Sequence, residues 1–98
     1  MIIVSHRIFL RTSSGESAIR IDIHKPEKQE KVWSCRYDID WPEGKRTFEA
    51  IGFDALQSLV LALQMIGAEI YSSAYHLEGR LRAYDGEKGY GFPVSASL

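Results

Sequence analysis

Residues 52–77 read GFDALQSLVLALQMIGAEIYSSAYHL, and this stretch decides the fold. Its less polar positions recur every three or four residues, as on one face of an α-helix, with Leu63 at the centre of a stripe formed by 56, 59, 60, 63, 66, 67, 70, 71, 74 and 77. Asp54 is a residue type that caps helix starts, and Gln57 can hydrogen-bond back to the cap. Gly79 can take the left-handed conformation that ends a helix. We therefore expect one long helix over about 54–77.

The length and composition of the chain indicate one small domain. The chain has 98 residues, of which 45% are hydrophobic, so residues 1–98 can bury a modest core as a single domain. A net charge of −1 and an isoelectric point near 6.3 give no general attraction to nucleic acid or to an anionic membrane. The single cysteine, Cys35, excludes an internal disulfide and fits a reducing compartment.

The first residues, MIIVSHR, lack the basic leader, the long apolar segment and the cleavage site of a signal peptide. The most apolar run, from Leu59 to Ala68, is interrupted by Gln64 and is about half as long as a membrane span requires. We therefore expect a cytoplasmic protein that does not cross a membrane.

Four segments before the helix alternate apolar and polar residues with the period of β-strands, at about 2–12, 18–25, 32–41 and 46–52. In the fourth, Phe48 and Ala50 should face inward. Because short connections join the four strands, we expect an α+β fold, a four-stranded antiparallel meander with the helix across its apolar face. After Gly79 the chain should return at 81–84, turn at Asp85-Gly86 and end as a short C-terminal hairpin or extended tail.

Two motifs carry a resemblance to a known family. The first is Gly52-x-Asp54-x-Leu56-Gln57-x-Leu59-x-Leu61-Ala62-Leu63 after four strands, and the second is Gly91-Phe92-Pro93 in the tail. In these motifs and in element order the chain resembles a family of small bacterial proteins of unknown function. The resemblance implies a sheet packed by one helix, and it brings no activity, cofactor or site residue. Some families of similar size are immunity proteins that neutralise toxins, which is an analogy only.

The segment EKGYGF, residues 87–92, resembles the nucleic-acid-binding strand of cold-shock domains, where bases stack on aromatic side chains. Pro93 stands where that strand would continue, and the chain is slightly acidic. We therefore favour a structural role for Tyr90 and Phe92, as core aromatics of the tail. Binding of single-stranded nucleic acid through Lys88 to Phe92 is the weaker alternative.

The sequence contains no short pair of metal ligands and no nucleophile beside a base. Among the candidate ligands, His6 and Cys35 share the inward phase of their strands and could meet, but a buried cysteine near a hydrogen-bonded histidine is commoner than a zinc site. His24 faces the other side of the sheet, and His76 projects from the helix end. We expect no enzyme activity, no metal and no cofactor.

The polar positions of the strands carry both signs of charge. We expect a solvated face, with each ion pair contributing a few tenths of a kcal/mol, although an exposed charged face could also dock a partner. The acidic residues are Asp22, Asp38, Asp40 and Glu49, and the basic ones are Arg7, Arg11, Arg20, Arg36 and Lys45.

The predicted helix contains one charged residue between Ala55 and Leu77, Glu69, whereas exposed helices are normally rich in charge. Four strands spaced about 4.8 Å apart make a face roughly 19 Å wide, and one helix covers about 10 Å of it. The tail aromatics should fill the remaining strip and cannot also cover the back of the helix. We therefore expect a homodimer, with an interface formed by a second line at helical spacing: Leu61, Met65, Ala68 and Ser72.

The function that the sequence supports best is a non-enzymatic cytoplasmic interaction module that self-associates through its helix. The alternative is an inhibitor or immunity-type protein that binds a protein partner through the charged face of the sheet.

Overall fold

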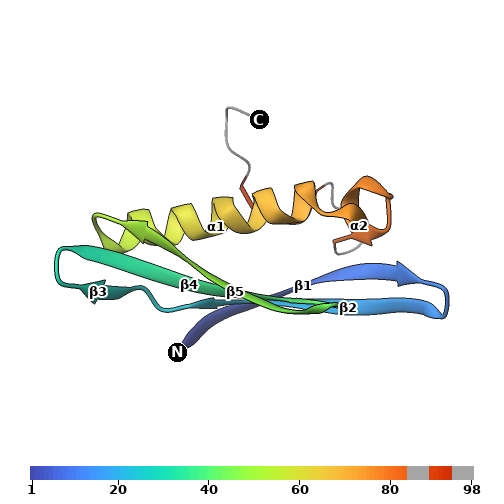
Figure 1. The fold of residues 1–98 in the computed structure, drawn as a ribbon, viewed down its shortest axis with the longest axis horizontal. Coiled ribbons are helices and arrows are strands. Elements are labelled where there is room, and N and C mark those ends of the chain that lie inside the picture. Colours follow the sequence, from blue (N-terminus) through green and yellow to red (C-terminus); the bar gives the residue numbers. More distant parts are fainter. Residues whose placement is uncertain (84–88, 94–98) are drawn as a thin grey trace.

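An antiparallel sheet with one main helix across one of its faces forms the body of the protein (Figure 1). The computed structural model describes residues 1–83 and 89–93. The predicted α+β class is therefore confirmed. Tyr84, the turn at Asp85-Gly86 and Lys88 lie outside the described residues.

The four long strands follow one another in space as they do in sequence, which confirms the predicted meander. Each pairs antiparallel with the next, and their bounds are β1 (Ile2–Thr12), β2 (Gly15–His24), β4 (Val32–Trp41) and β5 (Gly44–Gly52). β2 begins earlier than predicted because the β1–β2 hairpin closes with Thr12 opposite Gly15.

Two short strands extend the sheet. β3 (Glu27–Gln29) forms a hairpin with the start of β4, in a charged segment that has no apolar alternation. β6 (Leu81–Arg82) pairs with β1, so the chain does return to the sheet after Gly79 as predicted. β5 pairs along the whole length of one edge of β4, while β2 and β3 pair with successive parts of the other edge.

The predicted helix over 54–77 is in fact two helices, α1 (Ala55–Ser72) and α2 (Ala74–Leu77). The Asp54 cap is confirmed, because its side chain accepts a hydrogen bond from the Gln57 backbone N–H at 2.7 Å. The break occurs at Ser73, which is extended and uses its hydroxyl twice, accepting from His76 N and donating to Ile70 O. Hydrogen bonds from a serine side chain to nearby backbone groups compete with the backbone hydrogen bonds of a helix. A hydropathy pattern does not reveal this competition, so the break was not predicted.

The face of α1 that is buried differs from the predicted stripe. Ser58, Ala62, Ile66, Gly67 and Ile70 are buried, whereas Leu56 is 70% exposed. Small residues face the sheet because the two elements approach closely: a Cβ on Gly52 would come within 2.6 Å of the Ser58 backbone nitrogen. Further along α1 the large side chains Ile66 and Ile70 are completely buried, whereas Leu56 and Val60 remain exposed.

The core lies between α1 and the inner face of the sheet. It contains the inward residues of the strands, Ile8, Leu10, Ile19, Ile21, Ile23, Cys35, Tyr37, Ile39, Trp41 and Ala50. The predicted burial of Cys35 is confirmed, since its side chain is fully inaccessible. Phe48 shares this face with Tyr37 but remains 47% exposed, because β5 is an edge strand.

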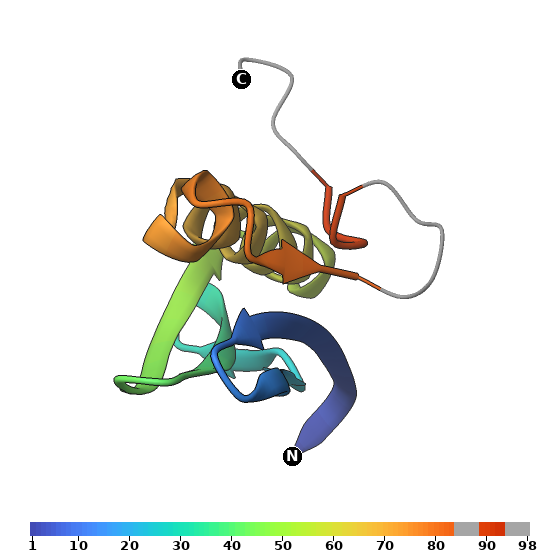
Figure 2. The same cartoon turned by 90° about the vertical axis from the view of Figure 1, so that its right-hand side faces the viewer.

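The C-terminal segment 89–93 lies beside α1 on the side of β1 (Figure 2). Tyr90 is buried and Phe92 packs partly buried against the core, as predicted for the tail aromatics. A Cβ on Gly67 would come within 2.8 Å of the Pro93 carbonyl oxygen, so the glycine lets the tail lie directly on the helix.

Candidate functional site

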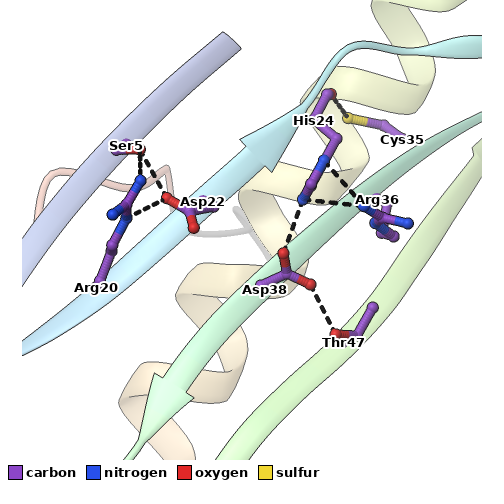
Figure 3. A network of polar contacts seen from close by, with 8 residues as sticks. All are labelled: Ser5, Arg20, Asp22, His24, Cys35, Arg36, Asp38 and Thr47. Atoms are coloured by element: carbon purple, nitrogen blue, oxygen red, sulfur yellow. Dashed lines mark hydrogen bonds and ion pairs between the residues drawn. The ribbon is translucent and has the colours of Figure 1, made fainter. Parts of the chain in front are cut away.

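Three ionisable residues are buried on the face of the sheet that points away from α1 (Figure 3). They are Asp22, His24 and Asp38, whose exposed fractions are 8%, 9% and 9%. Asp22 and Asp38 are direct partners across β2 and β4, so the sheet register brings the two carboxylates side by side. The expectation of a fully solvated face is therefore wrong at its centre, because neighbouring side chains cover these groups.

His24 and Asp38 form the first half of this polar network. The Nε2 atom of His24 lies 2.7 Å from Asp38 Oδ2, and Thr47 Oγ1 donates to Asp38 Oδ1 at 2.7 Å. Arg36 approaches Nδ1 of the same ring at 3.2 Å. Because a guanidinium can only donate, Nδ1 accepts, and the ring proton is assigned to Nε2, from which it is donated to Asp38. Both ring nitrogens are thus engaged.

Asp22 forms the second half of the network. Ser5 Oγ donates to Asp22 Oδ1 at 2.6 Å, and Arg20 Nε donates to the same oxygen at 2.8 Å. Burial raises the pKa of Asp22, but the hydrogen bonds from Ser5 and Arg20 outweigh it and hold the pKa below its ordinary value. Burial likewise raises the pKa of Asp38, and the bonds from Thr47 and His24 again outweigh it, so this pKa is also lowered.

Two shallow cavities border the network. One of about 230 Å³ is lined by His24, Arg36 and Glu49 among others, and one of about 320 Å³ is lined by Ser5, His6, Arg7 and Arg20. The serines that line them are hydrogen-bonded to neighbouring side chains: Ser5 Oγ donates to Asp22, and Ser34 Oγ accepts from Gln29. The arrangement can hold charged side chains in fixed positions for recognition.

The candidate metal ligands predicted from the sequence do not come together. His6 contacts the Tyr90 carbonyl, Cys35 donates to the His24 carbonyl at 3.3 Å, and His76 contacts the Tyr90 hydroxyl. Within residues 1–83 and 89–93, no group of three or more His, Cys, Asp or Glu side chains is placed to hold a metal ion.

The predicted interface residues lie on one side of α1, and we call them the helix flank: Leu61, Met65, Ala68 and Ser72. Ala68 and Ser72 are exposed, as expected. Leu61 and Met65 are partly buried and pack against the core, so they do not lie at the back of the helix. The helix flank is on the β5 side of α1. Leu61 lies three positions from Ser58, which covers Gly52 of β5. Met65 and Ser72 lie four and three positions from Glu69, which pairs with Arg46 of β5.

Glu69, the one charged residue of α1, is directed at the sheet. Its carboxylate accepts a hydrogen bond from the Tyr37 hydroxyl and forms an ion pair with Arg46 of β5. Burial and this bond to Glu69 raise the pKa of Tyr37. The outward side of α1 therefore presents no charge.

The outer edge of β5 was missed by sequence reasoning. β5 pairs with β4 on one side, and its exposed apolar residues include Phe48 and Ile51, each 47% exposed. The order of the strands would have predicted this edge, because the last strand of a meander has one unpaired edge unless another segment pairs with it.

By length and composition alone, α1 could span a membrane, with a mean hydropathy of 1.2 over 18 residues. Only 28% of those residues are buried in the structure. A helix that packs on a sheet can have the same length and composition, and further apolar side chains of α1 pack partly buried against the core: Leu59, Leu61, Leu63 and Met65.

Comparison with known proteins gives one match. No curated protein and no solved structure is significantly similar to the chain. A family model described as domain of unknown function (DUF6968) matches residues 5–94, which include every long strand apart from the first residues of β1, and both helices. The chain therefore belongs to the DUF6968 family of domains of unknown function.

Proposed function

We propose that this protein is a non-enzymatic cytoplasmic interaction module that self-associates through the helix flank. The observation that carries the proposal is the absence of charge on the outward side of an 18-residue helix whose single charged residue, Glu69, is committed to Tyr37 and Arg46. Solvated helices carry charge on their outer face, so this surface is suited to burial.

The uncharged surface favours a second copy of the same chain as the partner. In a two-fold contact each residue near the axis lies close to its own counterpart, so a charge there would meet a like charge. A surface without charge complements itself. Ala68 is small and exposed, which would let two helices approach closely at that point.

The test is the oligomeric state of a helix-flank variant, measured by sedimentation equilibrium over a range of concentrations. Ala68→Glu should shift the protein to a monomer with an unchanged circular dichroism spectrum, because Ala68 is exposed and a glutamate there can reach water. The matched control is Val60→Glu at an exposed position of α1. Val60 lies two turns before Gly67, on the side of α1 that faces the C-terminal segment and not β5. This control should remain a dimer.

Three results would contradict the proposal. A wild-type monomer at every concentration would exclude self-association, and a dimeric Ala68→Glu variant would place the interface elsewhere. Sedimentation of the wild type with uncharged phosphatidylcholine vesicles, lost in Ala68→Glu, would assign the apolar side of α1 to a membrane surface.

A second candidate function is an inhibitor or immunity-type protein that binds an acidic protein surface through the outer face of the sheet. The observation in its favour is the buried network, which holds Arg20 and Arg36 in place before any partner arrives. Arg36→Glu should abolish salt-sensitive binding to an acidic partner protein, while Ala68→Glu should leave it intact. Equal binding by wild type and Arg36→Glu would exclude this face.

A further inference from the structure

The outer edge of β5 offers a row of backbone groups for pairing. The strand is joined to β4 by the two-residue turn Pro42-Glu43, which makes Trp41 and Gly44 the closing hydrogen-bonded pair. Hydrogen-bonded pairs then alternate, so the even residues of β5 bond to β4 and the odd residues point their N–H and C=O outward. Among the described residues no strand pairs with this edge.

We propose that β5 pairs antiparallel with β5 of a second copy about a two-fold axis at Thr47, which joins the two sheets into one. This inference rests on the proposed self-association and names the strand and register that complete it. A long unprotected edge invites such pairing, and the question is which partner the side chains of β5 fit.

Charge complementarity favours a second copy in this register. Within one chain, Lys45 is opposite Asp40 and Glu49 is opposite Arg36 on the outer face. A two-fold axis at Thr47 places Lys45 opposite Glu49 of the partner subunit. A row of alternating charge then crosses β4 and β5 of one chain and β5 and β4 of the other: Asp40, Lys45, the partner's Glu49 and the partner's Arg36. The two-fold symmetry generates a second, identical row. Cross-strand pairs of opposite charge are stabilising.

The neighbouring registers lack this match. An axis at Phe48 places Lys45 opposite Ile51 of the partner subunit, and an axis at Arg46 places two arginines opposite each other. A shift by a single residue would set the inner face of one sheet against the outer face of the other. The axis at Thr47 also sets Arg46 opposite the partner's Phe48, and these residue types already stack within one chain, 5.1 Å from guanidinium carbon to ring centroid.

The position of α1 fits the same axis. The helix lies over β4 and β5 (Figure 1), and neighbouring strands are about 4.8 Å apart. A helix axis midway between these strands would lie about 5 Å from the two-fold axis, so the two helices would be about 10 Å apart. Packed helices are separated by about 8–10 Å. One arrangement therefore pairs the strand edges and brings the helix flanks into contact.

The experiment is a charge reversal across the new strand pair, with the dimer dissociation constant measured by sedimentation equilibrium. Lys45→Glu and Glu49→Lys should each weaken the dimer by about tenfold, because two attractive pairs become repulsive. The double variant Lys45→Glu/Glu49→Lys should return to within about threefold of the wild type. Lys28→Glu on β3 is the control of equal charge change, and it should leave the constant unchanged.

A cysteine placed on the two-fold axis tests the register. Thr47→Cys should form a disulfide-linked dimer under mild oxidation and Phe48→Cys should not, since only position 47 meets itself across this axis. The buried Cys35 stays out of reach in both variants. A dimeric wild type whose affinity is unaffected by Lys45→Glu would overturn the strand pairing and leave the proposed function standing. A wild type that never dimerises would overturn both.

Discussion

The Nε2 atom of His6 lies 2.9 Å from the carbonyl oxygen of Tyr90, and this contact joins the first strand to the C-terminal segment across 84 positions of sequence. A carbonyl can only accept, so the histidine donates. At the other end of Tyr90, the hydroxyl lies 2.5 Å from Nδ1 of His76, and the ring packs against Tyr71. Tyr90 is thus held at both ends between β1 and the helices, which makes it a structural residue of the tail.

Replacement of Tyr90 should therefore lower stability. Tyr90→Ala should reduce the free energy of unfolding by about 3 kcal/mol, since truncation of a buried aromatic leaves a cavity, whereas Tyr90→Phe should cost about 1 kcal/mol for the lost hydrogen bond. Urea denaturation measures both. Salt-sensitive binding of single-stranded RNA by the wild type, abolished in Tyr90→Ala, would instead support a nucleic-acid-binding role.

The buried carboxylates should make stability depend on acid pH. The folded-state pKa values of Asp22 and Asp38 lie below the ordinary value of 3.8, so their contribution is complete above that pH and is lost as pH falls through the lower folded-state values. The free energy of unfolding should decline steeply from about pH 4 downward. Denaturation in urea at a series of pH values measures this decline.

Asp38→Asn tests the origin of that acid dependence. The variant should lose about 2 kcal/mol at pH 7, because the bonds from His24 and Thr47 no longer have an ionised acceptor, and its stability should vary less with acid pH. Asp40→Asn, an exposed neighbour on the same strand, should behave as the wild type. Identical acid profiles for wild type and Asp38→Asn would show that this carboxylate is not the cause.

The structure places the centre of the helix–sheet contact at Ile66, which is completely buried, rather than at the predicted Leu63. Ile66→Asp should abolish the cooperative thermal transition, since an unpaired carboxylate there has no access to water. Leu63→Asp should fold with reduced stability, because Leu63 is only partly buried and lines a cavity with Val4 and Phe92. Thermal melting of both variants, followed by circular dichroism, tests this prediction. A cooperative transition in Ile66→Asp at the wild-type temperature would refute the placement of Ile66 at the centre of the helix–sheet contact.

The sequence was sufficient for features that depend on neighbours in the chain. Strand alternation has a period of two, and the inward position that it predicted for Cys35 is confirmed by the complete burial of this residue. The Asp54 cap was also predictable, since its bond to Gln57 spans three positions.

The features that depend on tertiary approach could not be read from the sequence. The buried side of α1 was predicted with a shifted phase because Ser58 and Ala62, which the predicted stripe omits, are completely buried, and a hydrophobicity pattern gives such small residues little weight. The polar network was missed because its members meet only through sheet register: Ser5 and Asp22 are 17 positions apart, and His24 and Asp38 are 14 apart. Because these side chains are polar or charged, they were predicted to be exposed. The hydrogen bonds that they form with one another offset the free-energy cost of burying them.

The last prediction concerns the link between Tyr37 and Glu69, which ties α1 to β4. Tyr37 is fully buried, so its hydroxyl has no water to replace a lost acceptor. Glu69→Ala should therefore cost about 2 kcal/mol, mostly through the unsatisfied hydroxyl. The half-exposed Arg46 should contribute little, since ion pairs of exposed side chains typically add less than about 1 kcal/mol.

A double-mutant cycle separates these contributions. Tyr37→Phe removes the hydroxyl, so Glu69→Ala in that background should cost about 1.5 kcal/mol less than in the wild type, which gives a coupling energy of that size. Arg46→Ala serves as the matched cycle with Glu69→Ala, and its coupling should be smaller. The free energies come from urea unfolding at one protein concentration at which sedimentation shows every variant to be monomeric, so that association does not enter the comparison. Additive losses for Tyr37 and Glu69 would mean that the contact does not stabilise the fold, and that the exposed ion pair or packing alone holds α1 on the sheet.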